Sequence, residues 1–235
     1  MPLVAMSPHE AADRLHHSLG GAWTLQALNA SNFCDTWQAR DGGGARLFVK
    51  TAAASAAALL RAEGEGLLSL AATHTIAVPR LAAFEASAAG AMLALDWLDF
   101  AAPDPGFGAR LGERLAALHA WPQPRFGWER DNYIGATLQR NGWTLADTLA
   151  DWIGFWRDKR LVPMREALAR RGVGIALLKE VDAVGDSLLT LFADGHQPRP
   201  SLIHGDLWSG VGRRGGTGDD GAVRQPAGRV LARLR

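Results

Sequence analysis

The sequence predicts an α+β fold with an N-terminal antiparallel-sheet lobe that includes a packed helix, and a C-terminal lobe that is mainly helical. Predicted strands dominate 22–98, whereas segments with apolar residues at helical spacing dominate 107–193. With 48% hydrophobic and 21% charged residues, the composition is that of an ordinary globular protein. Because strand and helix patterns are segregated, we expect two lobes with a crossing near 96–105.

The N-terminal lobe, assigned to 1–98, begins with a helix predicted over 8–18. Segments 22–29 and 34–40 alternate as strands do, and 45–50, 78–86 and 91–98 are predicted as three more strands, with turn residues at 41–44 and 87–90. A helix over 52–70 lies between the third and fourth strands, although Gly64 and Gly66 weaken helix propensity in its middle.

The C-terminal lobe, assigned to 99–210, contains three segments with helical spacing: 107–120, 143–170 and 175–193. Pro, Gly and Asn are frequent in 121–142, so we expect a long loop there. From Val211 onward the chain has six Arg and six Gly but few large apolar residues. We therefore expect 211–235 to be a tail that is disordered up to about Val230.

Charge and cysteine content exclude several classes of protein. The formal net charge is +1, so no overall field favours nucleic acid or an anionic membrane as a partner. The single cysteine rules out an internal disulfide and a cysteine-based zinc site. The N-terminus has no basic segment followed by an apolar core, so we expect no signal peptide and a cytoplasmic protein.

The motif that points most directly to chemistry is His204-Gly205-Asp206, which follows a short apolar segment. A carboxylate on a loop after a strand can accept a hydroxyl proton and orient that hydroxyl for attack. His204 can hold such a loop by hydrogen bonds. Taken alone, Asp206 is equally well explained as a turn residue that caps backbone amides.

The position of Lys50 favours the interpretation of Asp206 as a catalytic residue. Lys50 ends the predicted strand 45–50 and precedes an acidic helix. A lysine in this position can pair with nucleotide phosphates and be held by a glutamate on the helix. Glu63 shares a helical face with the packing residue Leu67, whereas Glu65 is more consistent with a solvated charge. The alternative is an exposed lysine at a strand end.

These segments resemble the fructosamine kinase (ketosamine 3-kinase) family, a relative of the aminoglycoside and choline kinases. The resemblance extends from about residue 8 to Gly210. It is carried by LFVK at 47–50, LGERLAALH at 111–119, FGWERDNYIGATLQRNGW at 126–143, DWIGFWRDKRL at 151–161 and HGDLWSG at 204–210.

The resemblance implies a protein-kinase-like fold that uses ATP and Mg²⁺. The implied reaction is phosphorylation of the sugar 3-hydroxyl of a ketosamine such as a fructosamine or ribulosamine, free or protein-bound, which leads to deglycation. It implies no partner among nucleic acids or membranes, and the sequence does not predict an oligomeric state.

By position, the resemblance makes Asp206 the catalytic base. Lys50 corresponds to the lysine that binds the ATP phosphates, with Glu63 as its partner, so 1–98 becomes the ATP-binding lobe. The backbone of 96–98, which is Asp96, Trp97 and Leu98, corresponds to the segment that holds adenine. We expect Lys50→Ala to weaken ATP binding while leaving the fold intact.

The resemblance also places several residues near the substrate cleft of the lobe 99–210. These residues are Asn132, Gln139, Trp208 and the aromatic group Trp152, Phe155 and Trp156. Aromatic side chains at one-turn spacing are more often core residues than ligand contacts, so both interpretations of the aromatic group stay open.

Two departures from the family pattern concern activity. The loop 29–32 lacks the glycines usual in a phosphate loop, and Val211 stands where the pattern has a metal-binding Asn. In the family pattern the main metal ligand is the Asp of an Asp-Pro-Ala motif. The only counterpart in this chain is Gln225-Pro-Ala, and a neutral Gln binds magnesium weakly. We therefore expect no metal ligands after Gly210 and an incomplete lobe 99–210, through either a shifted reading frame or a genuine basic tail.

The departures leave three functions open. The first is a ketosamine kinase, whose turnover as this chain we expect to fall far below the roughly 1–100 s⁻¹ usual for kinases. The second is a catalytically inactive remnant or pseudokinase that still binds nucleotide. The third is a sister kinase that acts on aminoglycosides or choline.

Overall fold

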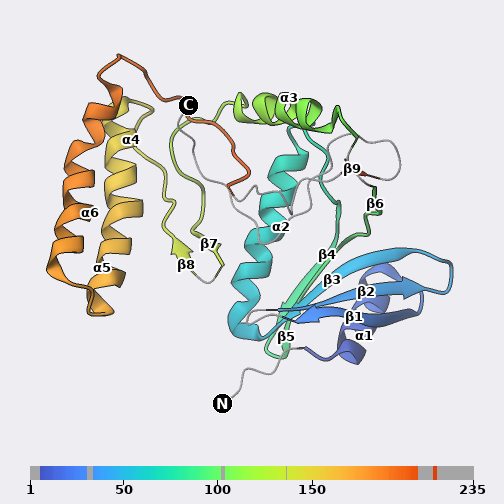
Figure 1. Ribbon diagram of the computed structural model, residues 1–235. Helices are drawn as coiled ribbons and strands as arrows, with labels where there is room; N and C mark the ends of the chain where they lie inside the picture. Colours follow the sequence, from blue (N-terminus) through green and yellow to red (C-terminus); the bar gives the residue numbers. More distant parts are fainter. Residues whose placement is uncertain (1–5, 31–33, 102–103, 136, 206–213, 216–235) are drawn as a thin grey trace. The chain divides into compact units, whose positions relative to one another are not determined.

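The computed structural model describes residues 6–30, 34–101, 104–135, 137–205 and 214–215 (Figure 1). Its sheet of five antiparallel strands has the order β1-β2-β3-β5-β4. The strands are β1 (Trp23–Ala30), β2 (Asp35–Asp41), β3 (Arg46–Ala52), β4 (Leu81–Ser87) and β5 (Gly90–Asp96). All five strands predicted from the sequence are confirmed, within a few residues at their ends.

The described helices are α1 (Pro8–Leu19), α2 (Ala57–Ala71), α3 (Phe107–His119), α4 (Leu149–Trp156), α5 (Val162–Arg170) and α6 (Ile175–Ser187). Short 3-10 turns span Ala54–Ala56 and Leu188–Phe192, and a π-helical turn, Arg157–Leu161, joins α4 to α5. None of the helices in this described part of the chain is both long and apolar enough to cross a membrane.

The helices α1 and α2 pack on opposite faces of the sheet. On β5, Met92 and Ala94 belong to a buried cluster with Leu15 of α1, whereas Leu93 and Leu95 belong to a second cluster with residues of α2. Because successive side chains of a strand point to opposite faces, a strand covered on both sides is apolar throughout. This explains the uninterrupted apolar run of β5.

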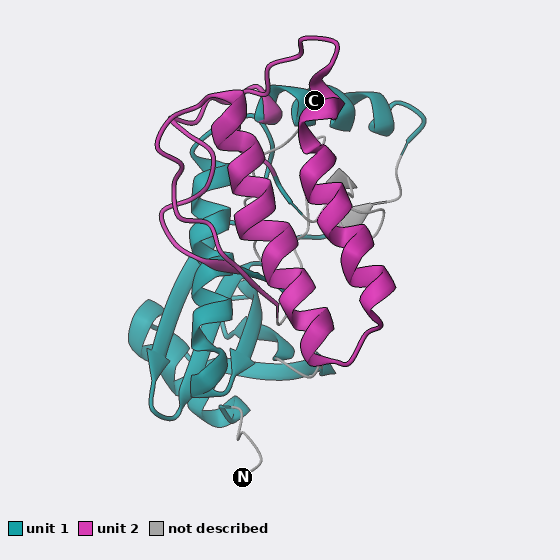
Figure 2. Ribbon diagram, turned by 90° about the vertical axis from the view of Figure 1, so that its left-hand side faces the viewer, with its two compact units in different colours: residues 1–118, 133–136, 204–229 teal, residues 119–132, 137–203, 230–235 magenta. Residues whose placement is uncertain are grey.

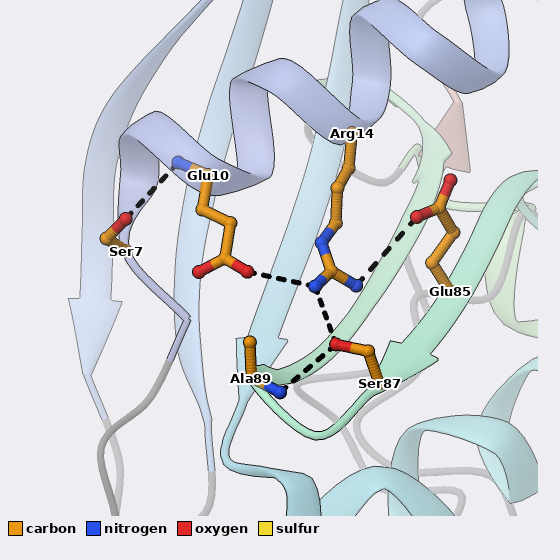
Figure 3. A network of polar contacts seen from close by, with 6 residues as sticks. All are labelled: Ser7, Glu10, Arg14, Glu85, Ser87 and Ala89. Carbon is orange, nitrogen blue, oxygen red and sulfur yellow. Dashed lines mark hydrogen bonds and ion pairs between the residues drawn. The ribbon is translucent and has the colours of Figure 1, made fainter.

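Polar contacts fix α1 to the turn between β4 and β5 (Figure 3). Ser7 caps the helix by accepting a hydrogen bond from the Glu10 N–H at 3.2 Å. The Arg14 guanidinium donates to Glu10 at 2.9 Å and to the Ser87 hydroxyl at 2.7 Å, and it lies 3.8 Å from the Glu85 carboxylate. One side chain thus joins the helix to two positions of the sheet.

Helix α2 runs without interruption through the two glycines that weaken its propensity. A Cβ at Gly64 would lie 3.3 Å from Leu93 Cδ1 and 3.6 Å from Leu81 Cδ2. Gly64 is therefore a point of close approach between helix and sheet, and the packing it permits outweighs its lower helix propensity. Residues adjacent to it in sequence, including Glu63, are held tightly against the sheet.

The chain divides into two compact units, shown in different colours in Figure 2. Unit 1 comprises Met1–Leu118, Tyr133–Ala136 and His204–Arg229, and unit 2 comprises His119–Asn132, Thr137–Ile203 and Val230–Arg235. By this division α3 is grouped almost entirely with the sheet. The lobe boundary expected at residue 98 stays a prediction.

In unit 2, the continuous run of α4, the π-helical turn and α5 lies beside α6 (Figures 1 and 2). The helix predicted over 143–170 begins only at Leu149, because the Thr148 hydroxyl accepts a hydrogen bond from the Asp151 N–H and so caps α4 there. The prediction of an unbroken helix from 143 is wrong for its first turns.

Short strand pairs occupy two segments expected to lack regular structure. Within the predicted loop 121–142, β7 (Asn132–Ile134) and β8 (Thr137–Gln139) form a two-stranded sheet. In the segment expected to be disordered, β9 (Arg214–Gly215) pairs antiparallel with β6 (Phe100–Ala101). The rest of the tail lies outside the described residues, so its expected disorder stays a prediction.

Candidate active site

A buried ion pair joins β3 to α2. The Lys50 ammonium donates to both carboxylate oxygens of Glu63, each at 2.7 Å. Lys50 is 7% exposed and Glu63 is 1% exposed. The pairing that the sequence predicts is present, whereas phosphate binding by Lys50 stays a prediction.

The pair follows from the periodicities of the two elements. On β3, Leu47 and Val49 belong to the cluster facing α1, so the alternating residue Lys50 points to the α2 face. On α2, Glu63 lies three residues after Leu60 and four before Leu67, both of which pack on that face. An ammonium group has three N–H donors, and no third acceptor for Lys50 is found among the described residues.

The burial of this pair changes one expectation. Taking two charges out of water is costly, and removal of one partner leaves the other buried and uncompensated. The Lys50→Ala variant should therefore lose stability as well as any affinity for nucleotide, so the expectation that this substitution leaves the fold intact is revised. A test of nucleotide binding at Lys50 needs a variant in which both charges are removed.

The segment predicted to hold adenine, 96–98, directly follows β5. The N–H groups of Asp96 and Trp97 already donate to backbone carbonyls, at 3.0 Å to Arg80 and 3.3 Å to Arg46. For the Leu98 N–H, no acceptor is found among the residues that the structure describes. Of the three predicted residues, Leu98 therefore offers the N–H that is open to a ligand.

Side chains around this segment form two ion pairs that hold it in place. Arg80 donates to both carboxylate oxygens of Asp96, at 2.8 and 3.0 Å. Arg46 and the Trp97 indole donate to Asp99, and the Arg46 hydrogen bond is the main reason why the pKa of Asp99 is lowered. These contacts tie the exit of β5 to β3 and to the start of β4.

The approach to Asp206 is well defined, although Asp206 and Trp208 themselves lie outside the described residues. Ser201 forms an antiparallel bridge with Pro122, and the Leu202 N–H donates to the Trp121 carbonyl at 3.1 Å. His204, two residues before the predicted base, is 2% exposed. Its burial fits the prediction that it holds the loop.

The predicted substrate residues Asn132 and Gln139 lie on the hairpin strands β7 and β8, and each is 5% exposed. The Gln139 amide donates to the Leu138 carbonyl at 3.3 Å. Their contact with a substrate is not tested by the structure and stays a prediction.

The aromatic group of α4 belongs to a hydrophobic core. Trp152 and Phe155 are buried in one cluster with Phe126 and Phe192, and Trp156 packs against it. The Trp152 ring meets the Phe192 ring edge-on at a centroid distance of 5.0 Å. Of the two interpretations left open by the sequence, the structure supports the core for Trp152 and Phe155.

Sequence reasoning missed one buried cation. Arg160 is 8% exposed, lies in the π-helical turn, and donates to Asn141 at 2.7 Å. The available signal was Pro163, because a proline inside a helical pattern leaves a carbonyl without its usual donor.

No group of three or more metal-binding side chains occurs within the described residues. The carboxylates that a magnesium ion prefers are therefore not assembled in this part of the chain. By contrast, a lysine held by a buried glutamate suits the phosphates of a nucleotide.

Comparison with known proteins places the chain in a family. The sequence profile of the fructosamine kinases matches residues 10–227. The chain belongs to the fructosamine kinase family. The match continues beyond Gly210, the residue at which we expected the resemblance to end.

Curated relatives named as ketoamine or ribulosamine kinases match more than half of this chain. A "Probable ketoamine kinase" of Synechocystis sp. is 41% identical over 171 residues, which cover 72% of this chain and 55% of the relative. A chloroplastic protein-ribulosamine 3-kinase of Arabidopsis thaliana is 35% identical over 69% of this chain and 49% of the relative. The chain thus spans about half the length of the curated relatives it matches.

The fold agrees with the family assignment. The crystal structure of a Thermobifida fusca protein named after fructosamine-3-kinase matches 96% of this chain and 75% of that protein, with a TM-score of 0.80 and 28% identity. The predicted protein-kinase-like α+β fold is confirmed.

Proposed function

We propose that this protein transfers phosphate from ATP to the sugar 3-hydroxyl of a ketosamine, such as a fructosamine or ribulosamine, as a step toward deglycation. The observation that carries the proposal is the buried Lys50–Glu63 pair in a chain of the fructosamine kinase family. The names of the Synechocystis and Arabidopsis relatives support a ketosamine as the acceptor.

In this proposal Lys50 binds the ATP phosphates through its remaining N–H donor, and Glu63 holds the ammonium in place. The Leu98 N–H donates to the adenine ring. Asp206 accepts the proton of the sugar hydroxyl as that oxygen attacks the γ-phosphate. Proton acceptance by a positioned carboxylate raises the rate by a factor of about 10²–10⁴. Positioning of the reactants and neutralisation of the phosphate charge supply the larger share of the rate enhancement.

Magnesium bound with ATP supplies charge neutralisation at the phosphates. Apart from 214–215, the positions after Gly210 that the sequence expectation concerns lie outside the described residues. Low turnover of this chain is part of the proposal, so nucleotide binding must be measured separately from phosphate transfer.

The test combines ATP titration by calorimetry with transfer of labelled phosphate to a panel of acceptors under single-turnover conditions. The panel contains a fructosamine, a ribulosamine, choline and an aminoglycoside, each with and without Mg²⁺. We expect phosphate to appear on the sugar 3-oxygen of the ketosamines in preference to the other acceptors.

Each other result identifies a different function. Preferential phosphorylation of choline or the aminoglycoside would overturn the ketosamine proposal in favour of a sister kinase. Binding of ATP without transfer to any acceptor would overturn catalysis and indicate an inactive nucleotide-binding relative.

A further inference from the structure

Arg160 is a buried cation that the proposed chemistry does not use. Its guanidinium lies over the ring of Phe155, with 4.7 Å between Cζ and the ring centroid. Burial lowers the pKa of Arg160 to about 10, and the nearby Asp131 carboxylate opposes that shift. The side chain is therefore a cation at neutral pH, and a buried cation is retained only where several acceptors compensate its desolvation.

The first acceptor of the Arg160 guanidinium is a backbone carbonyl that lacks its usual hydrogen bond in the helix that carries Arg160. Pro163 has no N–H, so the carbonyl of Lys159, four residues earlier, cannot receive the usual helical hydrogen bond. The Arg160 guanidinium donates to that carbonyl at 3.0 Å. The helix continues as a π-helical turn, in which the Val162 N–H reaches back to the Arg157 carbonyl.

The other acceptors lie on a different segment of the chain, next to β8. The Arg160 Nη1 donates to the Arg140 carbonyl at 2.6 Å, and Nη2 donates to Asn141 Oδ1 at 2.7 Å. Because the guanidinium is planar and rigid, these bonds fix the direction as well as the distance of residues 140–141.

Asn141 also forms hydrogen bonds with the segment that precedes the β7–β8 hairpin. Its N–H donates to Asp131 Oδ1 at 2.8 Å, and its amide group donates to the Arg130 carbonyl at 3.2 Å. Its carbonyl accepts a hydrogen bond from the Trp128 N–H at 2.7 Å. One guanidinium thus anchors, directly or through Asn141, both segments that flank the hairpin.

The hairpin held in this way carries Asn132 and Gln139. Residues 142–144, which directly follow Asn141, line an open surface pocket of about 340 Å³ together with Phe155 and Lys159. Arg160 therefore connects α4 and the π-helical turn to a segment with two buried amides and an adjacent open pocket.

We propose that Arg160 is a positioning residue for the acceptor sugar, which acts by holding the segment 128–143 in the geometry that binds it. This inference rests on the proposed ketosamine kinase function. Arg160 does not contact the reacting atoms in this proposal; its effect is exerted through Asn141. A misplacement of binding groups by about 1 Å can reduce a rate by about 10²-fold, so loss of the anchor should be measurable.

The test compares Arg160→Lys and Arg160→Met with a matched control, Arg165→Lys. Lysine keeps the charge but cannot form the three-acceptor fork, and methionine keeps only the apolar stem. Arg165 lies on α5 and donates to the single partner Asp182 at 2.5 Å, away from the hairpin contacts. Each variant is assayed for ketosamine KM and kcat, for ATP affinity, and for amide hydrogen exchange at Trp128 and Asn141.

We expect kcat/KM for the ketosamine to fall by about 10- to 100-fold in Arg160→Lys, mainly through KM, and further in Arg160→Met. Amide exchange at Trp128 and Asn141 should accelerate in the same order, whereas ATP affinity and the control variant should match the wild type. Unchanged exchange and unchanged KM in Arg160→Lys would overturn the inference. An equal loss of ATP affinity in both variants would also overturn it, because that result indicates general unfolding.

Failure of the proposed function would be distinguishable from failure of this inference. If the wild-type protein phosphorylates no ketosamine, the function is wrong and Arg160 cannot position a ketosamine. If the wild type is active and the exchange at Trp128 and Asn141 is unaffected by Arg160→Lys, only the positioning role is wrong.

Discussion

Lys50 and Glu63 are joined by two hydrogen bonds of 2.7 Å at a position where less than a tenth of either side chain is exposed. The pair links the third strand of the sheet to the helix that packs on it. Since each charge is compensated by the other, the two residues must be changed together to separate a role in folding from a role in nucleotide binding.

Removal of either partner alone should destabilise the protein. We expect Lys50→Met or Glu63→Leu to lower the free energy of unfolding by about 3–5 kcal/mol, because the remaining charge stays buried without its partner. The double variant should recover most or all of this loss, since an apolar pair of similar volume is often neutral or stabilising. Urea denaturation of the four proteins measures the effect.

The same double variant tests nucleotide binding in a folded protein. We expect its Kd for ATP to rise by about 10- to 100-fold, because a charge-assisted hydrogen bond to phosphate is lost. Arg61→Met is the control, since Arg61 is an exposed cation of α2 that lies over the Phe84 ring, 5.0 Å from its centroid. Equal ATP affinity in the wild type and the double variant would show that Lys50 does not bind the nucleotide.

The Asp206→Asn variant distinguishes a role of Asp206 as the catalytic base from a role as a turn residue. Asparagine can cap backbone amides as aspartate does, but it cannot accept a proton. We expect single-turnover phosphate transfer to fall by about 10²–10⁴ with ATP affinity unchanged. Asp194→Asn is the matched control, because Asp194 caps the His196 N–H at 2.9 Å in a turn. Equal rates for wild type and Asp206→Asn would favour the turn interpretation.

Gly127 is a position where no other residue fits. Its φ is +117°, and a Cβ there would lie 2.3 Å from the Asn141 carbonyl oxygen. Gly127→Ala should therefore cost about 1–3 kcal/mol of backbone strain and also displace the Trp128–Asn141 hydrogen bond. Gly172→Ala provides the comparison, since Gly172 has φ +74° but nothing within 4 Å of the new Cβ.

Thermal denaturation of both glycine variants separates strain from steric clash. We expect the lower melting temperature for Gly127→Ala, with an altered tryptophan emission, because the Trp128 and Trp143 rings lie 6.0 Å apart beside this contact. Equal melting temperatures would show that the segment adapts to the added methyl group.

Asp151 at the N-terminus of α4 makes the stability of the protein dependent on pH. A hydrogen bond from the Thr148 hydroxyl is the main cause that lowers the pKa of Asp151 below its ordinary value of 3.8. A carboxyl whose folded pKa is depressed stabilises the protein above the unfolded pKa and loses this contribution as the pH falls through the folded pKa. The stabilisation by Asp151 is therefore complete at neutral pH and is lost progressively as the pH falls from about the ordinary value of 3.8 through the lower folded pKa.

We expect Asp151→Asn to lower the free energy of unfolding at pH 6, and the difference from wild type to shrink at pH 4 and again at pH 3. Asp147→Asn, at an exposed position two residues before α4, is the control for the loss of one carboxylate in this segment. Urea denaturation at the three pH values decides the prediction; a constant difference would contradict it.

Periodic patterns within single segments predicted much of the fold. Apolar patterns and turn residues located all five strands of the sheet, and the order of strand, lysine and acidic helix predicted the pairing of Lys50 with Glu63. The role of Asp206 as a base stays a prediction, because Asp206 lies outside the described residues. The strand predictions succeed because a strand imposes its period on its own residues.

The tertiary structure decided what depends on contacts between distant segments. Neither the hairpin β7–β8 nor the anchoring of Asn141 by Arg160 has a local period that the sequence displays. Likewise, Trp152 and Phe155 could line a cleft or fill a core until Phe126 and Phe192 were found packed against them. The sequence thus predicted the five-stranded sheet, most of the helices and, as one of two interpretations of Lys50, its pairing with Glu63. Burial and long-range hydrogen bonds, which depend on residues far apart in the chain, decided the rest.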